Sequence, residues 1–219
     1  MKKVKRAGLN TLCSNLVGCG TASYAALARE YLFSKIAGVH VNPAIGSEFG
    51  YHIDFLNRKS LVIAISQSGE TMDILESVKK AKERRAKIAC LTNVPGSSLY
   101  RLSDYKMLIG AGPEKAVAST KAFSGMLAHL VLSAYSLAEK FREGQKVLVK
   151  TSESAKKVLS PSSVQKIKKL AQKILNKDNV YVIEGNLIYS CGGICCRRIK
   201  TRAFGARRKR RSLHSIFAG

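Results

Sequence analysis

The stretch Ser66-Gln67-Ser68-Gly69-Glu70-Thr71 connects an apolar run over residues 61–65 to a segment of helical pattern over residues 72–84. An apolar run followed by a turn and a helix predicts a buried strand of an α/β fold. The turn is rich in hydroxyl groups, and its glycine lets the backbone bend close to a ligand. The helix after it presents N–H groups without intrahelical partners and a partial positive charge. The stretch therefore predicts a phosphate-binding turn or, alternatively, an ordinary helix capped by Ser68 or Thr71.

The spacing within this turn excludes one class of phosphate site. A nucleotide P-loop has the pattern Gly-x-x-x-x-Gly-Lys-Ser/Thr, which the turn lacks. We therefore expect a phosphate monoester rather than a magnesium-bound triphosphate, and we expect neither a cofactor nor a metal.

Apolar runs of strand length alternate with segments of helical period along the chain, which predicts an α/β fold. Parallel strands need crossover helices, so we expect a three-layer αβα sandwich around a mostly parallel five-stranded sheet. Ligands of such sheets bind at the carboxyl ends of the strands. The expected strands cover residues 15–18, 39–42, 61–65, 87–91 and 106–109. The expected helices cover residues 23–36, 46–56, 72–85, 97–101 and 119–142.

Composition divides the chain into four expected parts. Residues 1–145 form the α/β domain, and residues 146–161 form a linker rich in Ser and Lys. Residues 162–189 are expected to begin a second, incomplete α/β unit, with a helix over 164–175 and a strand over 179–184. Residues 190–219 form a basic tail rich in Cys and Arg, which we expect to be poorly ordered.

The net charge of +24 favours anionic partners. Nine of the 38 basic residues lie between Arg197 and Arg211, but no aromatic stacking platform accompanies Arg207–Arg211, so we do not expect nucleic-acid binding. No apolar run is long enough to span a bilayer, and the basic start at Met1–Arg6 is not followed by a signal-peptide core. A cytoplasmic protein is expected.

The six cysteines fit a cytoplasmic protein. Cys13, Cys19 and Cys90 lie in apolar surroundings and are expected to be small buried hydrophobes. Cys191, Cys195 and Cys196 are not expected to bind a metal, because adjacent cysteines are hard to place on one tetrahedral ion and no partner pair follows.

Four further motifs accompany the Ser66–Thr71 stretch, in order along the chain. They are Cys19-Gly20-Thr21, Ser47-Glu48-Phe49, Asn93–Ser98 and Val117–Phe123. Together the five motifs resemble the sugar isomerase (SIS) domain family. Within it they are most similar to the first SIS half of the isomerase region of glutamine–fructose-6-phosphate aminotransferases, the glucosamine-6-phosphate synthases. The resemblance is strong over residues 14–142 and weaker through 180–189.

The resemblance implies a ligand and its binding residues. The ligand is a phosphorylated hexose such as fructose 6-phosphate or glucosamine 6-phosphate. The residues matching family ligands of the phosphate and sugar are Thr21, Ser66, Gln67, Ser68, Thr71, Val117, Ala118 and Ser119. One departure lies among them, because the family's Thr-Ser pair is Thr21-Ala22 in this chain. The lost hydrogen bond weakens binding by about 0.5–1.5 kcal/mol, and Ser23 points elsewhere on the helix.

The resemblance also implies what the chain lacks for catalysis. The family's glutaminase domain has no counterpart before the first strand, and the catalytic Glu, His and Lys of the second SIS half and the tail are not recognisable, so no catalytic residue is assigned. We expect a truncated or frameshifted form, because the codons for Cys191–Cys196 read one base later can encode Ala, Val and Glu. Sequencing the gene through this region tests that hypothesis.

Alternatives remain open at this point. The chain could be a stand-alone isomerase or aminotransferase completed by another chain, or a sugar-phosphate-sensing module. Glu48 and His52 could supply acid–base chemistry to a stand-alone isomerase, although His52 and His129 fall on predicted helices and suit structural roles. The expected protein partner is a second copy or a complementing SIS or glutaminase chain.

Overall fold

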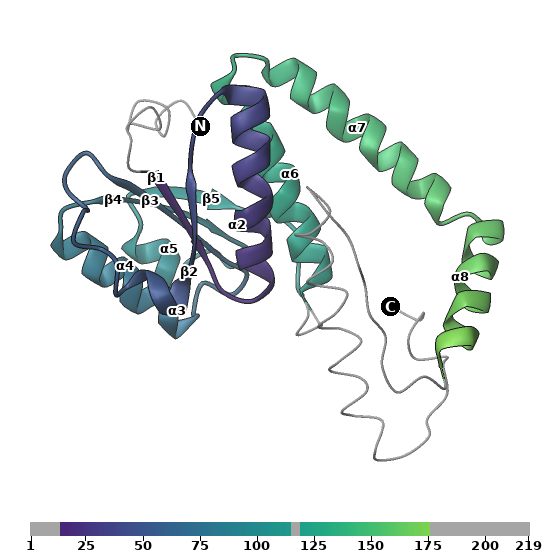
Figure 1. The fold of residues 1–219 in the computed structure, drawn as a ribbon, viewed down its shortest axis with the longest axis horizontal. Coiled ribbons are helices and arrows are strands. Elements are labelled where there is room, and N and C mark those ends of the chain that lie inside the picture. The colour runs from purple at the N-terminus through teal and green to yellow at the C-terminus, as the bar shows by residue number, and fades with distance from the viewer. Residues whose placement is uncertain (1–13, 115–118, 176–219) are drawn as a thin grey trace. The chain divides into compact units, whose positions relative to one another are not determined.

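A computed structural model describes residues 14–114 and 119–175 of the chain (Figure 1). It divides the chain into two compact units, residues 1–157 and 158–219. The first unit contains a five-stranded sheet with strand order β2-β1-β3-β4-β5, in which every pair of neighbours is parallel. The strands are β1 (Ser14–Gly18), β2 (Asn42–Ile45), β3 (Leu61–Ser66), β4 (Lys87–Thr92) and β5 (Tyr105–Leu108).

Helices cover both faces of the sheet in the first unit (Figure 1). On one face lie α2 (Thr21–Leu32), which continues into a π-helical turn η1 (Phe33–Ala37), and α6 (Thr120–Leu137). On the other lie α3 (Gly46–Phe49), α4 (Met72–Glu83) and α5 (Ser98–Leu102). Because helices cover both faces, all six residues of β3 are buried, as is usual for a central parallel strand. The predicted three-layer α/β fold is confirmed, with a sheet that is wholly parallel.

One core cluster fills the space between the sheet and α4. Val17, Val62 and Cys90 of the strands pack there with Ile74 and Val78 of α4. The alternation along each strand divides the apolar side chains between two helical layers, as the period of a strand requires. The prediction that Cys90 is a buried hydrophobe is confirmed.

The second strand lies three residues later than the sequence predicted. We expected residues 39–42, and β2 instead covers Asn42–Ile45. Pro43 lies inside it, and proline normally argues against a strand because it lacks an N–H. The strand tolerates Pro43 because β2 is at the edge of the sheet, where one side of the strand has no partner strand.

The helix that we predicted after the second strand is shorter than expected. The helix predicted over 46–56 ends at Phe49, and Ile53 and Leu56 are buried from turns that follow α3. Their apolar spacing therefore reflects packing of turns rather than a helix, and His52 lies in a turn, not on a helix as predicted.

The long helix predicted over 119–142 is two helices, α6 and α7 (Phe141–Val158). Glu139 adopts a left-handed conformation with φ of 64°, and Lys140 N–H donates to Tyr135 O (2.8 Å) while Glu139 N–H donates to Ser136 O (3.2 Å). These are the bonds of a Schellman motif, in which glycine usually occupies the left-handed position. The break was missed because Glu139 carries no such signal.

The expected linker over 146–161 is mostly helical, because α7 continues to Val158. Lys- and Ser-rich composition suits an exposed helix as well as a linker, and nearly every residue of α7 is exposed. Only Leu159 and Ser160 separate α7 from α8 (Pro161–Ile174). Pro161 occupies the first turn of α8, and the side chain of Ser160 accepts a hydrogen bond from Ser163 N–H, a normal helix start. The division into four domains stays a prediction.

Several predictions fall on residues outside the described ranges. They concern Cys13, the strand over 179–184 and the whole tail over 190–219, including Cys191, Cys195, Cys196 and Arg207–Arg211. Within residues 14–114 and 119–175, no helix is both long and apolar enough to cross a membrane. The same residues contain no cluster of three His, Cys, Asp or Glu side chains with the geometry of a metal site.

Candidate functional site

The strand order places a topological switch point between β1 and β3. The chain leaves β1 for α2 on one face of the sheet and leaves β3 for α4 on the other. In sheets of this kind, ligands bind at the carboxyl ends of the strands beside such a switch point. Gly18 and Ile65 are paired in the register at that end, so Thr21 and the Ser66–Thr71 loop follow neighbouring strands.

Hydrogen bonds within the Ser66–Thr71 loop fix its shape. Ser66 is buried, and its Oγ accepts from Gly69 N–H (3.0 Å) and lies 3.0 Å from Thr71 Oγ1. Ser68 Oγ accepts from Glu70 N–H (3.1 Å). Ser66 thus closes the loop from inside, while Ser68, which is partly exposed, lies nearer its surface.

The alternative of an ordinary capped helix does not describe the start of α4. Thr71 is the N-cap residue by position, yet no side chain caps the helix with a hydrogen bond, because Thr71 Oγ1 bonds to Ser66 instead. The first-turn N–H groups of α4 are therefore left without a side-chain cap at the carboxyl end of β3. An anion bound there would interact favourably with the helix dipole.

The loop after β1 lies on the other side of the switch point. Gly20 precedes α2 with φ of 57°, and Thr21 begins the helix. A Cβ on Gly18 would lie only 2.7 Å from the carbonyl carbon and oxygen of Ala22, so the tight turn requires glycine there. Ala22 is buried, and Ser23 Oγ donates to Gly20 O (2.7 Å), so Ser23 bonds within its own turn.

Cys19 lies in the loop after β1 and differs from the buried hydrophobe that we expected. It is half-buried, and its Sγ lies 4.0 Å from Asp73 Oδ2 in the first turn of α4. Burial raises the pKa of the Cys19 thiol, and the nearby Asp73 carboxylate raises it further. The thiol therefore stays protonated near neutral pH.

The loop between β4 and α5 supports the Ser66–Thr71 loop from the side. Asn93 N–H donates to Gln67 O (3.0 Å), and Leu99 N–H donates to Gly69 O (3.0 Å). Ser98 N–H donates to Glu70 Oε1 (2.8 Å). The sequence predicted Asn93–Ser98 as one of the five motifs of the resemblance, and no local pattern in it indicated this supporting role.

The start of α6 contributes the last predicted contact residue that is described. Ser119 is its N-cap with φ of 50° and makes no capping bond of its own. The carboxylate of Glu114 instead accepts from Ala122 N–H (3.0 Å). Because α6 and α2 both enter from the carboxyl ends of strands and pack side by side, Ser119 lies at the same end of the sheet as Thr21 (Figure 1). Val117 and Ala118 lie outside the described residues.

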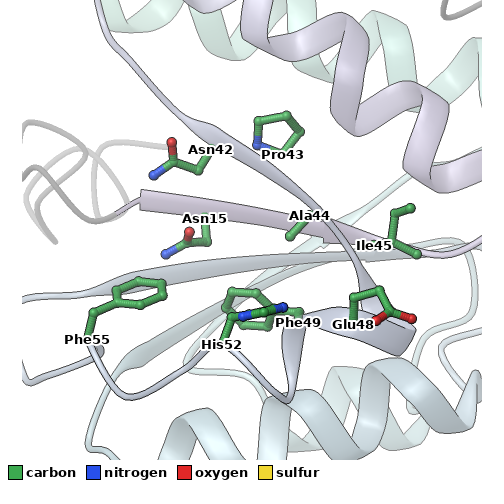
Figure 2. Close-up of a pocket in the computed structure, with 9 residues that line it drawn as sticks. All are labelled: Asn15, Asn42, Pro43, Ala44, Ile45, Glu48, Phe49, His52 and Phe55. Carbon is green, nitrogen blue, oxygen red and sulfur yellow. The ribbon is translucent and has the colours of Figure 1, made fainter.

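A cavity of about 450 Å³ lies elsewhere, beside the edge strand β2 (Figure 2). Its lining is mostly apolar, and it contains none of the predicted phosphate or sugar ligands. Glu48 and His52 lie along one side of it together with Phe49 and Phe55, as Figure 2 shows. The two side chains considered for acid–base chemistry therefore line this cavity rather than the Ser66–Thr71 loop.

Comparison with known proteins gives a family and its relatives. The SIS domain model matches residues 15–136. The chain is 37% identical over 185 residues to a glutamine–fructose-6-phosphate aminotransferase (isomerizing) of Helicobacter pylori, covering 82% of this chain and 30% of that protein. It is 41% identical over 131 residues to the protein of the same name from Listeria innocua, covering 60% of this chain and 22% of that protein. The chain thus spans less than a third of the length of these relatives.

Solved structures give the same picture. The C-terminal domain of glucosamine-fructose-6-phosphate aminotransferase from Francisella tularensis matches with a TM-score of 0.76 and 30% identity, over 87% of this chain and 55% of that chain. Glucosamine-6-phosphate deaminase from Thermotoga maritima matches with a TM-score of 0.55 and 26% identity, over 65% of this chain and 48% of that chain. Since the family model covers more than half of its residues and runs from β1 into α6, the chain belongs to the SIS domain family.

Proposed function

We propose that the chain binds a phosphorylated hexose, with fructose 6-phosphate as the first candidate. The observation that carries the proposal is the start of α4, which lacks a side-chain cap and faces a hydroxyl-rich loop at the switch point of the sheet. Support also comes from the curated relatives, which are named as aminotransferases of fructose 6-phosphate, and from the net charge of +24. The aligned region is 30% of the Helicobacter pylori protein, so the proposal concerns binding by this region.

The phosphate would lie against the Ser66–Thr71 loop. Ser68 and Thr71 hydroxyls, the Gln67 side-chain amide and the first-turn N–H groups of α4 would donate to its oxygens. Thr21 and Ser119 begin helices at the same end of the sheet and would contact the sugar, together with Val117 and Ala118. Ala22 offers no hydroxyl, so the site has one fewer donor than the family pattern.

The proposal assigns binding and no catalytic step to these residues. Aldose–ketose isomerisation requires a base that moves a proton between C1 and C2. None of the proposed ligand residues has a side chain that ionises near neutral pH. Pairing with a second copy or a complementing SIS or glutaminase chain stays a prediction, which the molar mass of the purified chain in solution tests.

Thermal unfolding in the presence of fructose 6-phosphate tests the proposal. Ligand at about 100 times its Kd should stabilise the chain by about 2.7 kcal/mol if it binds only the folded state. Fructose without phosphate is the matched control and should give no shift. Ser68→Ala removes one neutral donor, so we expect its Kd to be about threefold to tenfold weaker. No shift at millimolar fructose 6-phosphate, or an undiminished shift in Ser68→Ala, would contradict the proposed site.

A further inference from the structure

The Ser66–Thr71 loop carries a carboxylate, which is unexpected in a loop proposed to bind a dianionic phosphate. Glu70 is exposed, and an unpaired carboxylate on this loop would repel the phosphate. The structure directs it away. Glu70 Oε1 accepts from the N–H of Ser98, the first residue of α5, at 2.8 Å. This bond, the Ser98 hydroxyl and, to a smaller extent, the nearby Arg101 guanidinium lower the pKa of Glu70, so the carboxylate stays ionised near neutral pH.

Glu70 is one of three residues that anchor this loop to the β4–α5 loop and α5. The carbonyls of Gln67 and Gly69 accept from Asn93 N–H and Leu99 N–H, both at 3.0 Å. The Glu70 carboxylate completes the set from the neighbouring position, and the side chain of Arg101 in turn donates to Ser98 Oγ (3.1 Å) and to Gly96 O. The bonds join segments about 30 residues apart in sequence, so the shape of the phosphate loop depends on α5.

These anchors set the direction of the backbone N–H groups in the loop. The described peptide bonds are all trans, so the N–H of each residue points opposite to the carbonyl before it. Because the Gln67 carbonyl accepts from Asn93 N–H in the β4–α5 loop, the Ser68 N–H points away from that loop. The anchoring of Gln67 therefore fixes the direction of the Ser68 N–H.

We infer that Glu70 is a positioning residue of the sugar-phosphate site, which acts through its bond to Ser98 N–H by holding the Ser66–Thr71 loop against α5. The inference rests on the proposed function. In this role, phosphate binding requires the Glu70 oxygen that accepts from Ser98 N–H and does not require the charge of Glu70. A loop released from α5 would bind phosphate with a larger loss of conformational entropy and with misdirected donors.

Two substitutions of Glu70 separate the acceptor from the charge. Glu70→Gln removes the charge but keeps a carbonyl oxygen for Ser98 N–H, and Glu70→Ala removes both. If Glu70 positions the loop, Glu70→Gln should bind fructose 6-phosphate and inorganic phosphate at least as tightly as the wild type, and Glu70→Ala about tenfold more weakly. If the carboxylate only repels the ligand, both variants should bind more tightly than the wild type, and the inference is overturned.

A second pair changes the donor and leaves Glu70 in place. Ser98→Pro removes the N–H at the first position of α5, where proline is tolerated, and Ser97 before it already has φ of −60° and ψ of 163°. Ser98→Ala keeps the N–H and loses only the hydroxyl. Ser98→Pro should weaken binding about as much as Glu70→Ala, while Ser98→Ala should bind nearly as the wild type does. If Glu70→Ala fails to fold, this pair still tests whether the bond from Ser98 N–H to Glu70 supports phosphate binding.

The dissociation constants are measured by calorimetry, with the thermal midpoint of each ligand-free variant recorded beside them. A positioning role predicts weaker binding in Glu70→Ala and Ser98→Pro, and recovery in Glu70→Gln. Equal affinities of Glu70→Ala and Glu70→Gln, in a wild type that binds fructose 6-phosphate, would overturn the inference and leave the proposed function standing. A wild type that binds neither probe would overturn the proposed function first, and this inference with it.

Discussion

Gly69 lies directly against the loop between β4 and α5. Its φ is 70°, and a Cβ there would lie 2.1 Å from Ser97 Oγ and 2.6 Å from Ser97 Cβ. Both the backbone conformation and the missing space therefore require glycine. The contact also explains why the β4–α5 loop can lie directly against this turn.

Gly69→Ala should destabilise the fold by about 2–4 kcal/mol, because it adds a steric clash to the cost of a left-handed conformation. Gly96→Ala is the matched control, since Gly96 has φ of 76° but nothing within 4 Å of its would-be Cβ. The control should cost only about 1 kcal/mol. Urea unfolding of the two variants checks the difference, and equal losses would mean that the contact with Ser97 does not constrain the loop.

Arg29 is the most unusual buried side chain of the described residues. Only 2% of it is exposed, and its guanidinium lies 3.8 Å from the centroid of the Phe33 ring. Nε and Nη1 have no hydrogen-bond partner among the described residues. Burial lowers the pKa of the guanidinium to about 9. The cost of burying this group opposes folding.

Arg29→Met keeps a long apolar stem against Phe33 and removes the buried polar atoms. We expect it to stabilise the chain by about 1–4 kcal/mol at pH 7, by analogy with buried ion pairs replaced by apolar residues. The control is Arg84→Met, which breaks an exposed ion pair with Asp54 and should change stability by less than about 1 kcal/mol. Denaturant unfolding measures both, and a destabilised Arg29→Met would show that Arg29 has a favourable partner.

At the scale of elements, the sequence predicted the strands best where they are central. Residues 61–65 and 88–91 are continuous apolar runs, and β3 and β4 match the predicted strands to within one residue because all of their residues except Lys87 are buried. The edge strand β2 was misplaced because half-exposed strands tolerate Pro43 and show little pattern. The break after α6 was missed because Glu139 takes a conformation that its residue type does not indicate.

The candidate site was predictable in its motifs but not in its supports. Five short motifs indicated which loops meet at the carboxyl ends of the strands. The bonds from Asn93, Ser98 and Leu99 to the Ser66–Thr71 loop depend on how neighbouring parallel strands place their loops, which no local pattern records. Similarly, α4 has no side-chain cap because the hydroxyl of Thr71 bonds to the hydroxyl of Ser66. The sequence could not show whether the Thr71 hydroxyl makes this bond or caps the helix.

We expect His129 to make the stability of the fold depend on pH. Burial lowers the pKa of His129, and a hydrogen bond with the Ile109 backbone partly opposes that shift. With the folded pKa below the unfolded value of about 6.5, the unfolded chain binds more protons as the pH falls through this region. The contribution of His129 to stability is therefore present above the unfolded pKa and declines as the pH falls below it.

His129→Gln cannot titrate and keeps a neutral amide donor at this position. We expect its stability, relative to the wild type, to rise as the pH is lowered from about 7 to about 5. Urea unfolding of the two proteins at each pH gives the difference directly. A difference that is constant over this range would contradict the proposed coupling of His129 protonation to folding.

At the scale of the whole molecule, the SIS domain lies in the first of the two compact units. The family match covers residues 15–136, which span β1 to α6 to within one residue at each end. The positive charge of the chain favours the approach of an anionic ligand. The central claim is that such a ligand is a sugar phosphate and that its phosphate lies on the Ser66–Thr71 loop and the start of α4.

Backbone amide NMR shifts during titration with fructose 6-phosphate test this claim most directly, because they report the position of the ligand residue by residue. The account predicts the largest changes at Gln67, Ser68 and the first turn of α4, with fructose alone giving none of them. Saturating fructose 6-phosphate that leaves these amides unchanged, or that shifts mainly the residues of the cavity beside β2, would contradict it.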